Sequence, residues 1–283
     1  MTRVVERKKE LWMKDFFKMY VGQAFSLISS FAVQFAIIWW IATTSGSAIA
    51  LSIATVVGIL PQAILGPFVG VWIDRYNRKT IMILADSLVA VASAVLGLAF
   101  LFGDPSIAFV YVILMIRSIG NTFHTPAMQA AIPSLVPRDA LTRAAGLGQA
   151  VNSACNMISP MIGVFLISIL PLGGVMLLDI IGAGAAISML LTVKIKSIPN
   201  VVKKQSVLKD MKQGLMAIRE NKVLVSVSVF IMLSSIIFIP IGSLLPLIVN
   251  QHFGGNAWHI GLAQTLYSFG MLVAAVAEYT GPN

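Results

Sequence analysis

The sequence contains little charge and almost no cysteine. Only 11% of its 283 residues are charged and 58% are apolar, with a mean hydropathy of +0.89. A water-soluble domain has about 25% charged and about 45–50% apolar residues, so this composition excludes a soluble globular protein. Cys155 is the sole cysteine, which excludes a disulfide framework and a cysteine-based metal site.

Motifs for catalysis and cofactor binding are missing as well. The sequence has no His-Glu-x-x-His pair, no nucleophile elbow and no phosphate-binding loop. Asp86 and Asp179 lie in apolar surroundings, but neither follows the glycine of the Gly-Asp motif that an intramembrane aspartyl protease would carry. We therefore expect no enzyme, no cofactor and no metal ion.

Long apolar runs dominate the chain. A bilayer core about 30 Å thick is crossed by about 20 apolar residues in a helix. Eight runs of this kind occur, at about 19–42, 48–72, 80–102, 106–128, 144–168, 172–193, 223–249 and 257–277. The sequence thus predicts an all-α membrane protein with eight spanning helices.

The basic residues alternate with the runs and account for the net charge of +9. The turns at 43–47, 103–105, 170–172 and 250–256 contain no Lys or Arg, whereas the N-terminus and the intervening loops contain every one of them except Arg117. By the positive-inside rule, the N-terminus and the basic loops lie in the cytoplasm of a multi-pass cell-membrane protein. The charge reports membrane orientation, so we expect no nucleic-acid binding.

The lysine-rich segment between the sixth and seventh runs divides the chain. Within it, residues 205–220 place Val207, Leu208, Met211, Leu215 and Ile218 on one helical face, which predicts an amphipathic helix on the membrane surface. We expect three parts: a six-helix bundle at 1–193, a cytoplasmic central loop at 194–222, and two helices at 223–283.

A weak internal repeat relates the two parts. The stretch that begins Gly46-Ser-Ala48 is echoed by Gly255-Asn-Ala257, and parallel repeats of six helices are a known transporter construction. In this alignment the loop at Asp74 corresponds to the last residue, Asn283. We therefore expect a second half with two of six helices, and expect such a chain not to transport alone, because alternating access needs two bundles.

Three motifs carry a family resemblance. They are Gly70-Val-Trp-Ile-Asp74-Arg75-Tyr-Asn77-Arg78-Lys79, Arg117-Ser-Ile-Gly120, and Gly146-x8-Cys155-x3-Ser159-Pro160-x2-Gly163. In the first motif, Gly70 permits close helix approach, Asp74 caps a helix or pairs with Arg78, and Asn77 suits a turn with positive φ. A plain charged loop is the alternative. Together the motifs resemble those of the major facilitator superfamily, with Asn77, Cys155 and Ser159 in place of the usual glycines.

A closer resemblance is to the macrolide-efflux-like drug:proton antiporters, which are twelve-helix exporters. It rests on Gln34-Phe-Ala-Ile-Ile-Trp39-Trp40, on Leu60-Pro61-Gln62 with Gly66-Pro67, and on Asp74-Arg-Tyr-Asn-Arg78 with Asp86. The resemblance implies a helical bundle that exports a hydrophobic or amphipathic small molecule in exchange for protons, in contact with membrane lipids and without an obligate protein partner. It also implies a coupling role for Arg117 and a conformational latch at Asp74, Arg75 and Arg78. Transport of another solute and a non-transporting truncated membrane protein remain alternatives.

Ionisable groups inside the runs are the remaining candidates. Asp86, Arg117 and Asp179 lie within hydrocarbon depth, and either acid is within reach of the arginine, so the sequence does not choose between them. A change in their surroundings would favour proton uptake or release, whereas the alternative is a structural charge pair.

Uncharged polar residues in the runs are candidates for lining a substrate cavity. They are Gln34, Asn152, Asn156, Gln264 and Tyr267, and interhelical hydrogen bonds are the alternative role. His124, near the end of its run, is expected to be a hydrogen-bonding residue.

Overall fold

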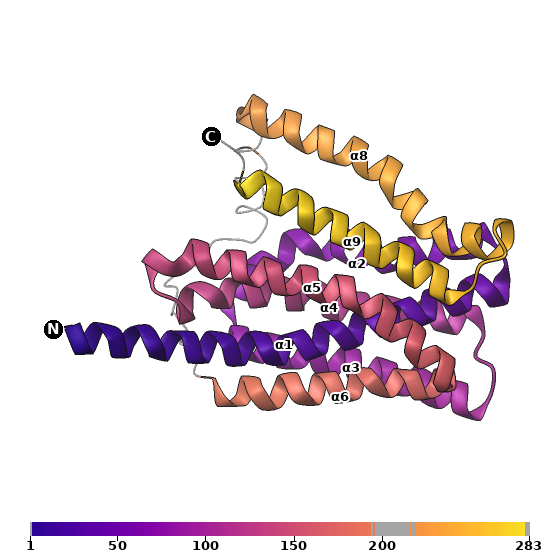
Figure 1. Ribbon diagram of the computed structural model, residues 1–283, viewed down its shortest axis with the longest axis horizontal. Coiled ribbons are helices and arrows are strands. Elements are labelled where there is room, and N and C mark those ends of the chain that lie inside the picture. Colours follow the sequence, from indigo (N-terminus) through magenta and orange to yellow (C-terminus); the bar gives the residue numbers. More distant parts are fainter. Residues whose placement is uncertain (1, 194, 196–215, 217–218, 281–283) are drawn as a thin grey trace.

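The computed structural model describes residues 2–193, 195, 216 and 219–280, and over these residues it consists of helices joined by short turns (Figure 1). The helices of the first part are α1 (Thr2–Ser45), α2 (Ala48–Arg75), α3 (Arg78–Phe102), α4 (Ile107–Leu135), α5 (Leu141–Ile169) and α6 (Leu172–Thr192), with a short 3-10 turn η1 (Arg138–Ala140) before α5. The second part contains α8 (Lys222–Leu247), a π-helical turn η2 (Ile248–His252) and α9 (Ala257–Thr280).

Each predicted apolar run coincides with one of these helices, which confirms the all-α fold. Seven helices in the described part of the chain, α1 to α6 and α8, are long and apolar enough to cross a membrane, and α9 covers the eighth run. The predicted starts and ends were less accurate: α1 begins well before residue 19, and α4 continues to Leu135 instead of ending near 128. The predicted amphipathic helix at 205–220 falls outside the described residues, apart from 216, 219 and 220.

Short polar side chains fix where several helices begin. Ser47 accepts a hydrogen bond from the backbone of Ala50, Ser106 from that of Phe109, and Asn221 from the backbones of Val223 and Leu224. Each bond satisfies an N–H group that has no partner within the first helical turn. These caps confine the breaks between helices to a few residues.

The helices pack side by side along one common direction, with α8 and α9 on one flank of the bundle (Figure 1). α1 contacts α2, α5 and α6, α3 packs between α4 and α6, and α9 packs against α5. Glycines allow the closest approaches: a Cβ atom on Gly163 would lie 2.9 Å from the carbonyl oxygen of Ala32. Small residues at such crossings are typical of membrane helices, whose association depends on close packing.

The two turns related by the internal repeat lie at the same end of the bundle. Gln251 donates a hydrogen bond to the carbonyl of Gly46 at 2.9 Å, and the helices that follow begin at Ala48 and Ala257, the alanines that the repeat aligns. Gly46 has a φ of 56°, but in the second turn the positive φ of 61° falls on Gly254, one residue before the aligned glycine. The other end of the bundle carries Arg75, Arg78, Lys79, Arg138 and Arg143, and we call it the basic end.

Candidate functional site

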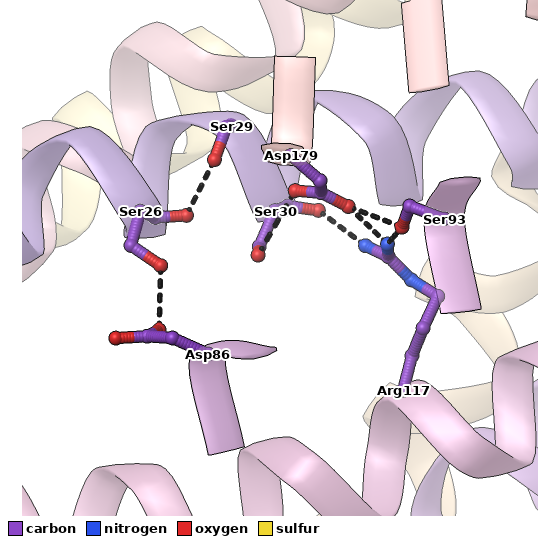
Figure 2. Close-up of polar contacts among 7 residues, drawn as sticks. All are labelled: Ser26, Ser29, Ser30, Asp86, Ser93, Arg117 and Asp179. Carbon is purple, nitrogen blue, oxygen red and sulfur yellow. Dashed lines mark hydrogen bonds and ion pairs between the residues drawn. The ribbon is translucent and has the colours of Figure 1, made fainter. Parts of the chain in front are cut away.

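A buried ion pair joins α4 to α6. The guanidinium of Arg117 contacts the carboxylate of Asp179 through Nη1 and Oδ2, and each residue is only 1% exposed (Figure 2). The choice that the sequence left open is therefore settled: Arg117 pairs with Asp179 and not with Asp86. α3 packs against both α4 and α6. The long side chain of Arg117 is therefore needed to bridge from α4 to Asp179 on α6.

Serines of α1 and α3 complete the surroundings of this pair. Ser93 donates to Asp179 Oδ2 at 2.6 Å and accepts from Arg117, while Ser30 donates to Asp179 Oδ1 at 3.2 Å. Arg117 Nη2 also donates to the backbone carbonyl of Ser30 at 3.2 Å, whereas its Nε has no hydrogen-bond partner among the described residues. Four helices, α1, α3, α4 and α6, thus meet at one ion pair with no net charge. Its hydrogen bonds offset the free-energy cost of removing the two charges from water.

Asp86 belongs to a second buried cluster, nearer the basic end. Its carboxylate accepts hydrogen bonds from Ser26 at 2.8 Å and from the Gln23 amide at 3.4 Å, and its Oδ1 lies 3.4 Å from His124 Nε2. His124 Nε2 also lies 2.6 Å from Gln23 Oε1. The expectation of His124 as a hydrogen-bonding residue is confirmed, but the sequence did not indicate its acidic neighbour.

Two hollows lie beside these clusters. The first, of about 510 Å³, is enclosed mainly by α1, α2, α3 and α4, and the second, of about 800 Å³, lies between α1, α2 and α5 on one side and α8 and α9 on the other. We call them the inner cavity and the interbundle cavity. Phe31, Gln34 and Gly58 line both, so the two hollows adjoin at these residues.

The structure places every predicted cavity residue on one of these walls. Gln34 lines both cavities, Asn152 lines the inner one, and Asn156, Gln264 and Tyr267 line the interbundle cavity. Interhelical hydrogen bonds are not the role of the asparagine pair, since Asn156 Nδ2 donates to Asn152 Oδ1 at 2.8 Å within α5. Of the ionisable candidates, Asp86 lines the inner cavity, whereas neither Arg117 nor Asp179 is among the residues that line it.

The loop motif at the basic end differs in two details from its prediction. Asn77 has a φ of −66° and caps α3 by accepting from the Lys79 backbone, so the expected positive φ is wrong. A Cβ atom on Gly70 would meet no atom within 4 Å, so no close helix approach depends on this glycine. The expected pair is present, with Arg78 Nη2 4.0 Å from Asp74 Oδ1, and Arg75 ends α2 beside it.

Lys79 has a role that the sequence did not indicate. Its ammonium donates to the carbonyls of Leu191 and Val193 at 3.0 Å each, at the end of α6. A cation at a helix C-terminus satisfies carbonyls that have no partner within the helix and interacts favourably with its dipole.

We expect Lys79→Met to lower the free energy of unfolding by about 1 kcal/mol, because the carbonyls at the end of α6 lose their donor. Arg78→Met is the matched control. Its ion pair is long and partly exposed, and its loss should cost less than about 0.5 kcal/mol. Denaturant unfolding of the detergent-purified variants, followed by circular dichroism, measures both; equal effects would contradict the assigned role of Lys79.

The small-residue motif of α5 faces α1. Cys155 Sγ lies 3.8 Å from the carbonyl oxygen of Ala24, and Ser159 is fully buried and donates to the Cys155 carbonyl. Cys155 and Ser159, which stand in place of the usual glycines, are therefore compatible with a close α1–α5 contact. Gly146 takes no part in it, because a Cβ atom there would meet nothing within 4 Å.

Known proteins resemble this chain in sequence and in fold. Macrolide efflux protein A of Streptococcus pyogenes is 36% identical over 267 residues, which cover 94% of this chain and 66% of that protein, and the protein of the same name from Enterococcus faecalis is 35% identical over 82% of this chain and 72% of its own length. The chain thus spans about two thirds of the length of the Streptococcus relative. Among solved structures, an inward-facing bacterial homologue of the human lysosomal transporter Spinster superposes with a TM-score of 0.70 at 16% identity, over 96% of this chain and 64% of that one.

The family assignment follows from sequence and fold together. The model of the Major Facilitator Superfamily matches residues 19–281, which include all the helices that build the two cavities. The chain is a multi-pass membrane protein, and the relatives named above are efflux proteins. It belongs to the Major Facilitator Superfamily.

Proposed function

We propose that this chain serves proton-coupled efflux of a hydrophobic or amphipathic small molecule by alternating access. It lies in the cell membrane with its N-terminus and basic end in the cytoplasm, as the distribution of Lys and Arg indicates. The relatives named for macrolide efflux support the substrate class, and the one-sided basic loops support the orientation.

The interbundle cavity is the observation that carries the proposal. Its wall contains residues from helices that precede and helices that follow the central loop in sequence. Phe35 and Trp39 come from α1, Phe238 from α8, and Tyr267 from α9. Apolar and aromatic side chains dominate, and a few amides such as Gln34 and Gln264 lie among them. A wall of this kind suits a ligand with a large apolar body and a few polar groups.

The charged residues are assigned two roles in this proposal. The Asp74–Arg78 pair and Arg75 form a latch at the basic end, where a contact near solvent can break and re-form during transport. Arg117, held by Asp179, couples the helices of the first bundle, because its guanidinium contacts groups from three other helices. Asp86 faces the inner cavity, where water can reach a carboxylate.

Phe238→Ala is expected to raise the Kd for erythromycin about three- to tenfold, because an aromatic wall of the interbundle cavity is lost. The matched control is Phe230→Ala. Both phenylalanines lie on α8 and are similarly exposed, at 64% and 71%, but Phe230 is not among the residues that line the cavity. Its replacement should leave the Kd unchanged.

Equilibrium binding of radiolabelled erythromycin to the full chain in lipid nanodiscs makes the measurement. Binding can be measured on this chain by itself, because its own helices form the interbundle cavity. Absence of saturable erythromycin binding by the wild-type chain would contradict the proposed substrate class. Equal effects of the two phenylalanine variants would place the binding site elsewhere.

A further inference from the structure

The buried Asp86–His124 cluster differs from the Arg117–Asp179 pair in its access to water. Asp86 and His124 are only 4% and 5% exposed, yet both line the inner cavity. Among the described residues on that wall they are the two ionisable ones, and the other polar groups are amides and hydroxyls. Neither Arg117 nor Asp179 lines the cavity. A proton that enters the cavity therefore meets the Asp86–His124 cluster first.

The hydrogen bonds of the cluster define where its protons lie. His124 Nε2 faces Gln23 Oε1 at 2.6 Å and Asp86 Oδ1 at 3.4 Å. An amide carbonyl and an ionised carboxylate both accept hydrogen bonds, so Nε2 carries a hydrogen and Nδ1 is the atom that takes up a further proton. The Gln23 amide is oriented consistently, since its nitrogen donates to Asp86 Oδ2 at 3.4 Å.

Among the described residues, Asp86 forms no ion pair with a lysine or an arginine. On α4, Arg117 is bound to Asp179 of α6. On α1, Lys18 is exposed, and Tyr20 is directed towards Gly148 of α5. On α3, Lys79 is bound at the end of α6, while α2 and α5 present the amides of Gln62 and Asn152. The cluster thus has a net charge of −1 with neutral imidazole, and uptake of one proton makes it neutral.

We infer that Asp86 and His124 together form a proton-binding site, and that the Arg117–Asp179 pair keeps its charges throughout. The inference rests on the proposed proton-coupled function for its role in transport, but the site itself is defined by its geometry. One proton enters from the inner cavity, binds the imidazole Nδ1, and leaves by the same cavity. No bond between other atoms forms or breaks.

The position of the cluster links its charge to the cavity wall. Gln23 and Ser26, which bind the Asp86 carboxylate, lie on α1, and the following turns of α1 supply Leu27, Phe31 and Gln34 to the inner cavity. A protonated His124 ring forms a stronger, charge-assisted hydrogen bond to the Asp86 carboxylate than the neutral ring does, and it competes with these donors. A change in the charge of the site therefore changes the hydrogen bonds of α1, the helix that lines both cavities.

Nitrogen-15 NMR of the full chain in nanodiscs, labelled at histidine, tests the inference. The chain has three histidines, and His252 and His259, which are exposed near the opposite end, serve as internal references. In the wild type we expect the ring signals of His124 to change with pH as Nδ1 takes up its proton. Asp86→Asn should move the midpoint of this change, because the carboxylate that faces Nε2 is lost.

Two variants complete the design. Asp86→Glu keeps the negative charge and should restore most of the wild-type midpoint. Ser93→Ala should leave it unchanged, because the side-chain hydrogen bonds of Ser93 join Arg117 and Asp179 and not Asp86 or His124. A His124 signal that does not change over the pH range overturns the inference even if Asp86→Asn fails to fold. A midpoint that Asp86→Asn leaves in place overturns it as well.

Erythromycin binding to the same samples at fixed pH separates the two proposals. Failure of the wild-type chain to bind erythromycin contradicts the proposed substrate class and leaves the histidine titration to decide the proton site. Conversely, normal binding together with an unresponsive His124 contradicts the proton site alone.

Discussion

Asp179→Asn is expected to lower the free energy of unfolding by about 3–5 kcal/mol, the largest effect that we predict. The asparagine leaves the Arg117 guanidinium buried without its counter-ion, and the remaining partners, the Ser93 hydroxyl and the Ser30 carbonyl, carry no charge. Unfolding in mixed micelles with increasing denaturing detergent, followed by circular dichroism, gives the free energy.

Two further variants isolate the cause of this loss. In the double variant Arg117→Met with Asp179→Leu no charge is left unpaired, so at least half of the lost stability should return, since apolar replacements of a buried pair are often tolerated. Asp104→Asn, in the exposed turn between α3 and α4, should cost less than about 0.5 kcal/mol. An effect of Asp179→Asn below about 1 kcal/mol would show that the pair does not hold the bundle together.

Gly182→Val is expected to cost about 2–3 kcal/mol of stability, because α1 and α6 are too close to admit a side chain there. A Cβ atom on Gly182 would lie 2.9 Å from the backbone carbonyl of Phe25 and 2.8 Å from the Cβ of Ser29. A backbone atom cannot move aside alone, so the two helices would separate. Because Asp179 lies one turn away on the same helix, its hydrogen bond from Ser30 would lengthen as well.

Gly184→Val is the matched control on the same helix. A Cβ atom on Gly184 would meet no atom within 4 Å, so the same substitution should change the stability by less than about 1 kcal/mol. The same detergent unfolding measures both variants. If Gly184→Val proved as destabilising as Gly182→Val, the cost would come from helix propensity rather than from the α1–α6 contact.

The sequence predicted the helices well because hydrocarbon thickness imposes a length on each apolar run. The run at 172–193 corresponds almost residue for residue to α6 (Leu172–Thr192). Ends that lie in water were less well predicted: the charged residues before position 19 continue α1, and α4 extends past its run to Leu135. Apolar length detects the membrane-embedded part of a helix and carries no information about its extension beyond the bilayer.

The candidate site was predicted in part. Depth along a helix placed each acid, Asp86 and Asp179, within reach of Arg117. It did not reveal which residues point towards one another, so both acids remained possible partners. The structure adds that direction and places Asp179 against Arg117 and Asp86 against His124. The importance of His124 is not apparent from the sequence, because the apolar run that contains it ends near residue 128. This places the histidine near the membrane surface, whereas α4 continues to Leu135 and the histidine lies inside the bundle.

The partners that α1 supplies to the two acids lie about one helical turn apart, at Gln23, Ser26 and Ser30. One helix therefore holds both carboxylates, although they belong to separate clusters on α3 and α6. A rotation of α1 about its own axis by a single residue, about 100°, would withdraw donors from both acids together. The orientation of this one helix thus affects the hydrogen bonding of both acidic groups at once.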